Sequence, residues 1–145
     1  MQALFSIKTQ YANAIYEGTK QLELRRYAPR QRCEKIWLYE TSPAKSITGY
    51  FTPSTVFRRM HYTDLLNAFG YQALIGEDLL RSSFHEKCVQ LEGILGTEPY
   101  RAIRITNPVK LSEPIDPKTI FARWQAPMSW RYARPSEEAL LNKYL

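Results

Sequence analysis

Three charged residues near the start of the chain could do chemistry on one ligand. Lys20, Glu23 and Arg25 stand within the run from Gly18 to Arg26. A lysine whose pKa is lowered by burial or by basic neighbours can act as a base, and a carboxylate can accept a proton or orient its partner. Lysine and arginine also bind phosphate, and a carboxylate can accept hydrogen bonds from the exocyclic amine of a base. The run is therefore a candidate for nucleotide binding or for hydrolysis.

A strand must position these side chains. Gly18 is typical of the end of a helix, and residues 22–26 alternate in the manner of a strand. The two leucines of this strand then face the buried side, while Glu23 and Arg25 share the opposite side. Such a strand is either a solvated sheet edge or a site, and the simpler role of Glu23 is an ion pair with Arg25 or Lys20.

The excess positive charge of the chain is concentrated in its first 60 residues. This part carries ten Lys or Arg and four Asp or Glu, whereas residues 61–145 carry ten of each kind. A local basic surface favours an anionic partner such as nucleic acid, and the alternative is a solvated basic face without a ligand. Phosphate contacts whose affinity falls with salt are expected from Lys8, Lys20, Arg25 and Arg26.

Length and composition predict one globular domain over residues 1–145, since 44% of the residues are hydrophobic and 23% are charged. No apolar run approaches the roughly 18 residues that span a bilayer, and no signal-peptide pattern is present, so we expect a cytoplasmic protein without a membrane partner. Cys33 and Cys88 form no CxxC pair and are expected to be reduced thiols. We expect no metal, because Cys88 fits the apolar face of a helix and no set of four ligands surrounds it. We expect no cofactor, because no P-loop or dinucleotide-binding motif occurs.

Hydrophobic periods and turn signals predict the order of elements. Strands are expected over 3–7, 22–26, 35–40, 46–51 and 101–105, and an extended segment over 127–134. Helices are expected over 10–17, 63–69 and 77–91, from Asp116 to Trp124, and from Ser136 onward. Thr9 is expected to cap the first helix and Gly18 to end it. This order predicts an α+β domain whose short strands form a small, partly closed barrel with helices around it.

Two pairs of aromatic residues could stack on bases. Trp37 and Tyr39 alternate on one face of the 35–40 strand, and Trp130 and Tyr132 do so near the C-terminus. Each base stacked on an aromatic ring contributes about 1–3 kcal/mol. The alternative is that Trp37 and Tyr39 fill the core.

Several short motifs follow one another in the order found in a known family. They are Ser6-Ile7-Lys8, Tyr11-Ala12, Ile15, Gly18-x-Lys20-x-x-Glu23-x-Arg25, Tyr39-x-x-Ser42-Pro43 and Gly49. Together they resemble the ASCH domain, a branch of the PUA-like superfamily. The segment Ala126-Pro127-Met128-Ser129-Trp130-Arg131-Tyr132 is similar to the tail of bacterial and phage members labelled predicted transcriptional regulators.

The resemblance implies a β-barrel with helices packed around it and a cleft beside the first helix, with the tail and a last helix over about 126–145 in the same domain. Relatives in the superfamily bind RNA or modified bases. Carried over residue by residue, the resemblance marks Lys20, Glu23 and Arg25 as cleft residues and Lys8 and Ser42 as residues of the rim.

Three functional hypotheses follow. The first is a nucleic-acid-binding module that holds a nucleotide or base of RNA or another single strand in the cleft, because unstacked bases can reach a pocket. Its contacts are expected from Lys8, Lys20, Glu23, Arg25, Arg26, Tyr39 and Ser42. The second is a hydrolase acting on RNA or on a modified nucleoside. The third is a regulatory or interaction protein that uses residues 61–145.

The hydrolase hypothesis also rests on the resemblance. Some ASCH proteins remove acetyl from N4-acetylcytidine with a lysine, a threonine and a distal glutamate, and another is a ribonuclease. Lys20 matches that lysine, but Glu23 stands at the threonine position, so the roles cannot be copied. A variant in which Lys20 is the base and Glu23 the proton acceptor is chemically sensible, although a neighbouring carboxylate favours the charged form of lysine.

Overall fold

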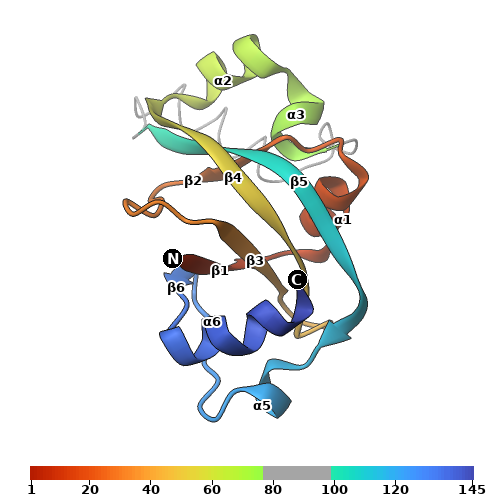
Figure 1. Ribbon diagram of the computed structural model, residues 1–145. Helices are drawn as coiled ribbons and strands as arrows, with labels where there is room; N and C mark the ends of the chain where they lie inside the picture. The colour runs from red at the N-terminus through yellow and green to blue at the C-terminus, as the bar shows by residue number, and fades with distance from the viewer. Residues whose placement is uncertain (77–98) are drawn as a thin grey trace.

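A computed structural model of the protein describes residues 1–76 and 99–145. Within these residues a mixed sheet of six strands has the order β2-β5-β4-β3-β1-β6 and curls into a half-barrel (Figure 1). The strands are β1 Gln2–Ile7, β2 Leu22–Arg25, β3 Lys35–Glu40, β4 Ser46–Met60, β5 Tyr100–Ile115 and β6 Trp130–Tyr132. β1 pairs with β3 in parallel, and the other pairs are antiparallel. The predicted α+β class with a partly closed barrel is confirmed.

Helices cover the sheet at three places. They are α1 Thr9–Glu17, α2 Tyr62–Phe69, α3 Tyr71–Ile75, α5 Pro117–Ile120, α6 Pro135–Leu141 and the 3-10 helix η2 Asn142–Tyr144. In Figure 1, α2 and α3 lie at one end of the molecule and α5 and α6 at the other, while α1 lies beside the long strand β5. No helix in residues 1–76 and 99–145 combines the length and apolar character that a membrane crossing needs.

Alternation along the strands divides the core into three apolar clusters. The cluster inside the half-barrel contains Phe5, Ile36, Leu38, Phe51 and Ile103 together with Ala12 and Ile15 of α1. A second cluster lies on the outer face of β2 and β5 and contains Leu22, Leu24, Tyr62, Leu65 and Leu74. The third contains Leu4, Trp37, Tyr39, Phe121 and Leu141 beneath the C-terminal helices. Both faces of the central strands are therefore buried.

Two strands are longer than their sequence patterns indicate. β4 continues past Phe51 to Met60 and β5 continues past Ile105 to Ile115, and the two pair with each other through several register shifts. One shift lies between Pro53 and Val56. A proline is tolerated in a strand at such an irregularity, because no ladder hydrogen bond is required there. The sequence prediction ended the two strands at Phe51 and Ile105, before these irregular parts.

The ends of the helices were predicted with mixed success. Lys8, not Thr9, is the N-cap of α1, with an extended backbone and no side-chain cap, so the capping role given to Thr9 is wrong. Gly18 ends α1 with φ 88°, as expected. The Asp116 carboxylate accepts a hydrogen bond from Lys118 N at 3.0 Å, but α5 ends at Ile120 and is shorter than expected. The helix predicted over 77–91 lies outside the described residues.

Candidate nucleic-acid interface

Arg25 bridges the gap between the two edges of the half-barrel. β2 is one edge strand and β6 the other. From β2, Arg25 Nη2 donates to Ser6 O in β1 at 2.8 Å, and Nη1 donates to O and Oγ of Ser129, just before β6, at 3.1 and 3.0 Å. Its guanidinium also lies 4.7 Å from the ring centroid of Phe5. Arg25, Ser6 and Ser129 are called the Arg25 bridge below.

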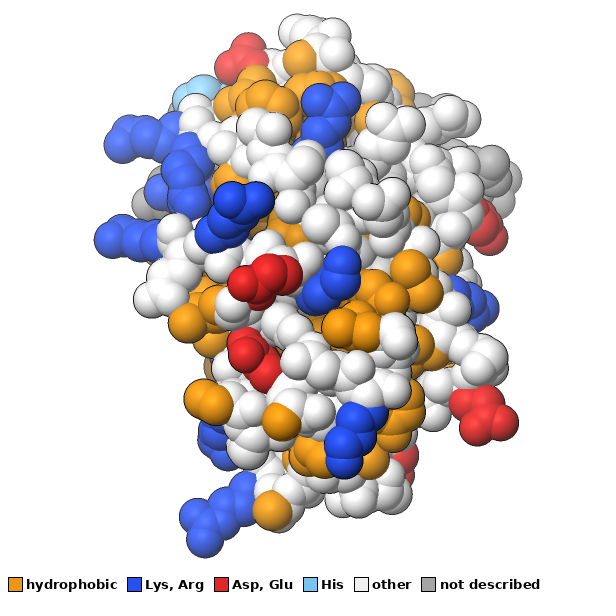
Figure 2. All heavy atoms as spheres, viewed as in Figure 1, with side chains coloured by type: hydrophobic (Ala, Val, Ile, Leu, Met, Phe, Trp, Pro, Cys, Tyr) orange, Lys and Arg blue, Asp and Glu red, His pale blue; other side chains and the backbone are white. Residues whose placement is uncertain are grey.

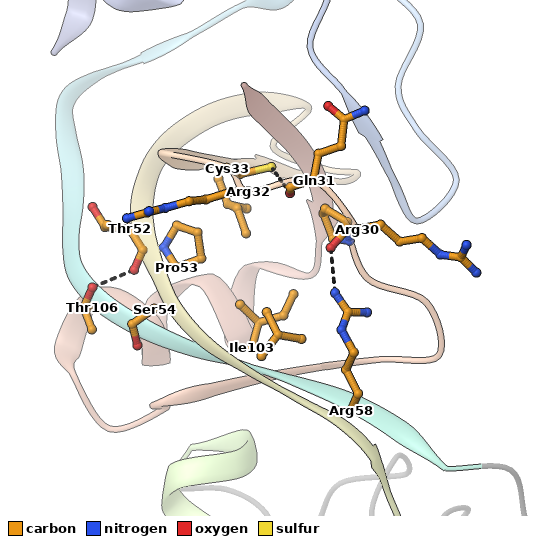
Figure 3. A pocket seen from close by; sticks show the side chains of 13 residues that line it. Arg30, Gln31, Arg32, Cys33, Thr52, Pro53, Ser54, Arg58, Ile103 and Thr106 are labelled. Carbon is orange, nitrogen blue, oxygen red and sulfur yellow. Dashed lines mark hydrogen bonds between the residues drawn. The ribbon is translucent and has the colours of Figure 1, made fainter.

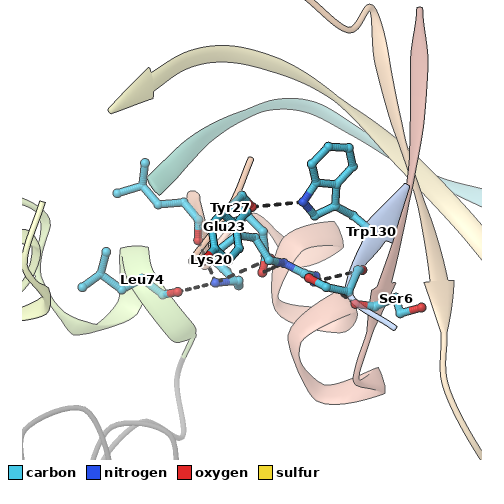
Figure 4. A network of polar contacts seen from close by, with 9 residues as sticks. Ser6, Lys20, Glu23, Tyr27, Leu74 and Trp130 are labelled. Carbon is cyan, nitrogen blue, oxygen red and sulfur yellow. Dashed lines mark hydrogen bonds and ion pairs between the residues drawn. The ribbon is translucent and has the colours of Figure 1, made fainter. Parts of the chain in front are cut away.

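Lys20 is buried behind this bridge, with 4% of its surface exposed. Its Nζ donates to Leu22 O at 2.7 Å and to Leu74 O, so an apolar helix packed on β2 supplies one of its acceptors. Figure 4 shows the ammonium held between these two chain segments. Burial lowers the pKa of Lys20, and the neighbouring carboxylate of Glu23 opposes this effect.

Glu23 lies between the lysine and the arginine and is itself 7% exposed. Its Oε1 accepts a hydrogen bond from Arg25 Nε at 3.2 Å, and its Oε2 lies 3.8 Å from Lys20 Nζ. Among the residues that the structure describes, Oε2 is a buried side-chain oxygen without a hydrogen-bond partner. An unpaired buried polar atom is unfavourable by about 1–3 kcal/mol and calls for a functional or structural reason. The interpretation as a solvated sheet edge is wrong, because Lys20 and Glu23 are buried.

An aromatic wall stands next to the Arg25 bridge. Trp130 Nε1 donates to Tyr27 O at 3.1 Å (Figure 4), and Tyr27 is 71% exposed. The rings of Trp130 and Tyr132 meet edge to face with centroids 5.1 Å apart. The hydroxyl of Tyr132 accepts hydrogen bonds from Arg30 N and Gln31 N. Residues 27–31 are thus fixed against β6, with Tyr27 facing solvent.

The other aromatic pair lies elsewhere. Trp37 is fully buried and Tyr39 is 7% exposed, and both belong to the cluster under the C-terminal helices. The Tyr39 ring packs against Trp124 with centroids 5.1 Å apart. No open ring face is left for a base, so the stacking role expected of Tyr39 is wrong and the core role is correct.

The cations that were expected to bind phosphate together are separated in the fold. Lys20 and Arg25 donate to main-chain carbonyls of the protein, as described above. Arg26 directly follows β2 and turns to the other side of the sheet, where its guanidinium is 4.4 Å from the Tyr100 ring centroid. These three residues therefore do not form one open phosphate site, because alternation and burial direct them to different surroundings.

Lys8 and Ser42 are exposed at the carboxyl ends of the parallel strands β1 and β3, where Thr41 N donates to Ile7 O at 3.0 Å. Within the described residues, no hydrogen bond or ion pair joins either of them to Lys20, Glu23 or Arg25. Their place on the rim stays a prediction.

Sequence reasoning missed a second basic surface. Arg30, Arg32, Arg58, Arg59 and Arg101 line two neighbouring hollows of about 430 and 360 Å³, and neither hollow is lined by Lys20, Glu23 or Arg25. The spacing Arg30-x-Arg32 and the pair Arg58-Arg59 in the basic part of the chain were the signals that could have indicated it. In residues 1–76 and 99–145, no group of three or more His, Cys, Asp or Glu side chains is placed to hold a metal ion.

Comparison with known proteins finds relatives that are similar to this chain over most of its length. No family model matches the chain. A curated relative from Zymomonas mobilis subsp. mobilis, named ASCH domain-containing ribonuclease, is 29% identical over 139 residues, which are 94% of this chain and 86% of the relative. The crystal structure of ASCH from Zymomonas mobilis matches with a TM-score of 0.77 and 25% identity over 98% of this chain and 94% of the other. This chain is similar to ASCH proteins over nearly its whole length. A crystal structure of a serine-to-alanine mutant of the same relative matches with the same TM-score of 0.77.

The ASCH-like motif residues have identifiable physical roles in this structure. Gly18 adopts the left-handed backbone that ends α1, and Lys20 and Arg25 connect β2 to α3 and to β1. Gly49 lies so close to its neighbours that a Cβ there would stand 2.2 Å from Val109 O. Much of the ASCH-like pattern therefore closes the half-barrel, and the same pattern surrounds the unpaired oxygen of Glu23.

Proposed function

We propose that this ASCH-like protein binds single-stranded RNA at the surface formed by the Arg25 bridge and the aromatic wall. The observation that carries the proposal is the juxtaposition of a cation, a hydroxyl and an exposed ring. Arg25 Nη1 donates to the exposed Ser129 hydroxyl, and Trp130 ties the exposed Tyr27 to the same edge. Splayed bases of single strands stack on such rings, and a hydroxyl beside a guanidinium can bind a sugar or phosphate oxygen.

The relative adds support, because an ASCH-like protein that aligns over nearly the whole chain is named a ribonuclease. The net charge of +6 agrees with a polyanionic partner. A nucleotide or base of the strand is the unit that this surface would hold. The cytoplasmic location expected from the sequence stays a prediction.

The test is fluorescence anisotropy with a labelled single-stranded RNA at low and at high salt. Tyr27→Ala removes an exposed ring, and we expect it to weaken binding about fivefold or more, the equivalent of about 1 kcal/mol or more for one stacked base. Tyr144→Ala removes an exposed ring near the C-terminus and serves as the matched control. Undetectable binding of the wild-type protein at low salt contradicts the proposal.

RNA hydrolysis is the second candidate, and the buried Lys20–Glu23 pair favours it. Cleavage at a ribose 2′-hydroxyl needs a proton acceptor, a cation near the phosphate and a group that protonates the leaving oxygen. Glu23 Oε2 has an unused acceptor site, and burial lowers the pKa of the adjacent Lys20. We propose that the Glu23 carboxylate accepts the proton of the 2′-hydroxyl while the 2′-oxygen bonds to phosphorus and the bond from phosphorus to the 5′-oxygen breaks, which leaves a 2′,3′-cyclic phosphate. Solvent water protonates the leaving 5′-oxygen, Lys20 holds the carboxylate in place, and Arg25 and Ser129 contact the phosphate.

Binding and cleavage can be separated by two substitutions. Glu23→Gln keeps the shape of the side chain but cannot accept a proton as a carboxylate does, so cleavage should fall at least about a hundredfold while RNA affinity changes less than about threefold. Ser129→Ala should weaken both. N4-acetylcytidine is included as a second substrate, and its turnover without RNA cleavage would assign the site to nucleoside hydrolysis instead. Equal cleavage by Glu23→Gln and wild type contradicts the assignment of Glu23.

The regulatory hypothesis receives little support from the described part of the 61–145 segment. α2 carries Asp64 in its first turn and no basic residue in its last turn, which is unlike a helix that reads duplex DNA. We therefore expect no sequence-specific retention of duplex DNA.

A further inference from the structure

A hollow of about 430 Å³ lies between the segment that follows β2 and the bent middle of β4 (Figure 3). Its floor is apolar and is formed by Ile36, Ile103 and Cys33 of the inner core cluster. Its rim carries Arg30, Arg32 and Arg58. The volume falls in the range of roughly 300–1,000 Å³ that is typical of small-molecule sites. An apolar floor with a cationic rim suits a ligand that has a flat ring and a negative charge.

A second hollow of about 360 Å³ adjoins the first, since Arg30 and Arg58 line both, and Arg59 and Arg101 complete it. We call the two hollows together the arginine pocket. Figure 2 shows Lys and Arg side chains gathered along the left edge of the molecule, the side on which β4 ends in Figure 1.

The backbone of β4 is shaped so that two consecutive arginines reach the same hollow. Successive residues of a regular strand point to opposite faces. Here the pairing of β4 with β5 shifts register between Phe57 and Met60, and Arg59 has φ 61°, which bulky residues rarely adopt. Arg58 and Arg59 consequently both line the second hollow. The bulge concentrates positive charge instead of distributing it over two faces.

Among the described residues this charge is only partly offset, by the carboxylate of Glu34, which interacts with Arg32. None of the ion pairs in residues 1–76 and 99–145 involves an arginine of the pocket. Two of these side chains donate to main-chain carbonyls, from Arg58 to Pro29 O at 3.1 Å and from Arg101 to Arg26 O at 2.7 Å. Clustered cations repel one another, and a bound anion would relieve that repulsion.

The arginine pocket is continuous with the proposed RNA surface. Tyr27 belongs to the aromatic wall, and the guanidinium of Arg101 lies 5.8 Å from its ring centroid. Arg30 follows three residues later on a segment that Tyr132 fixes through the main chain. A strand that stacks on Tyr27 would therefore reach the pocket within a short distance along its backbone.

We propose that the arginine pocket binds a nucleotide phosphate, with the attached base or sugar against the apolar floor, and that this nucleotide is a flanking residue of the bound RNA strand. The second part rests on the proposed function, whereas phosphate recognition rests on the pocket itself. Arg30, Arg58 and Arg59 contact the phosphate, and Arg32 closes the other side of the rim.

The experiment compares two double variants of the full chain that remove the same amount of charge. Arg30→Gln with Arg59→Gln removes two pocket arginines and keeps Arg58 and Arg101, whose side chains hold main-chain carbonyls. Arg104→Gln with Arg123→Gln removes two exposed arginines outside the pocket and is the control. Thermal unfolding should be the same for both, which excludes misfolding.

The probes are a 5′-hydroxyl single-stranded RNA, the same RNA with a 5′-phosphate, and a nucleoside 5′-monophosphate. We expect the pocket variant to bind RNA at least about tenfold more weakly than the control and to reduce the steepness of log K against log salt by about 0.7 for each phosphate that is no longer bound. Equal affinity for the two RNAs identifies an internal phosphodiester, and preference for the 5′-phosphate or the monophosphate identifies a terminal phosphate. Each of these supports phosphate binding in the pocket.

The two proposals fail in different ways. In the first case, wild type and both variants bind RNA with the same affinity and the same salt slope, and neither variant changes binding of the monophosphate. This result overturns the pocket proposal but leaves RNA binding in place. In the second case, wild type binds the monophosphate but no RNA, and the pocket variant no longer binds the monophosphate. This result supports phosphate binding in the pocket and overturns the proposed RNA function.

Discussion

The guanidinium of Arg25 donates to both the carbonyl and the hydroxyl oxygen of Ser129, at 3.1 and 3.0 Å, across the opening of the half-barrel. A residue near the start of the chain is thereby connected to one near its end. The same contact places a cation beside an exposed hydroxyl. Closure of the barrel and formation of the candidate site thus depend on one side chain.

Replacing Arg25 should destabilise the protein. Arg25→Ala removes hydrogen bonds to β1 and to Ser129, just before β6, and leaves Glu23 buried without its arginine partner, so we expect stability to fall by about 3 kcal/mol. Urea unfolding followed by circular dichroism measures it. Arg104→Ala, an exposed position on β5, should change stability by less than about 0.5 kcal/mol. A decrease below about 1 kcal/mol for Arg25→Ala would show that the bridge is not needed for closure.

Gly49 should tolerate no side chain. Its Cβ would lie 2.2 Å from Val109 O and 2.7 Å from the Tyr16 ring, so β4 and β5 would have to separate. We expect Gly49→Ala to destabilise the protein by about 3 kcal/mol, at the upper end of overpacking. Gly18→Ala meets no neighbour within 4 Å and suffers only from its φ of 88°, a destabilisation of about 1 kcal/mol. Thermal melts of the two variants compare these effects, and equal destabilisation would be evidence against the steric argument.

Acid should weaken the attachment of α6. Burial raises the pKa of Glu137, but hydrogen bonds from both terminal nitrogens of Arg131, at 2.7 and 2.8 Å, and from Arg134 N outweigh it, so the net pKa is lowered. Because the folded pKa lies below the unfolded value of about 4.5, this contribution is present above that pH and disappears as the pH falls through the folded value.

The measurement is the free energy of unfolding between about pH 7 and pH 3, on either side of the carboxylate's titration. Glu137→Gln should lower stability by about 1–3 kcal/mol at neutral pH and flatten the decrease below pH 4.5. If the free energy of unfolding of Glu137→Gln decreases with falling pH as steeply as that of the wild type, the role of this carboxylate is contradicted.

Cys33 should be unreactive in the folded protein. Burial raises the pKa of its thiol to about 11, so little thiolate is present at neutral pH. In a Cys88→Ser background, we expect maleimide labelling of Cys33 to be at least about a hundredfold slower in the native protein than in denaturant. Rapid native labelling would contradict this prediction and would mean that reagents reach the Cys33 thiol from the arginine pocket, which it lines, more easily than its 7% exposure indicates.

The local patterns of the sequence were sufficient for many elements. β3 has the predicted bounds Lys35–Glu40, and Gly18 and Asp116 act at the helix ends where they were expected. Periodicity and capping depend on neighbours within a few residues, which the sequence contains. The ASCH-like motifs were equally local, and they indicated the fold.

Only the tertiary structure decided which charged residues face solvent. Alternation correctly put Glu23 and Arg25 on one side of β2, but that side is the inside of a half-barrel, and burial there depends on β1, β6 and α3 far away in the chain. The arginine pocket likewise depends on the tertiary structure, because Arg30, Arg58 and Arg101 meet only through the pairing and bulge of β4 and β5. Side-chain direction is a local property, whereas exposure and charge clustering depend on how distant strands pack.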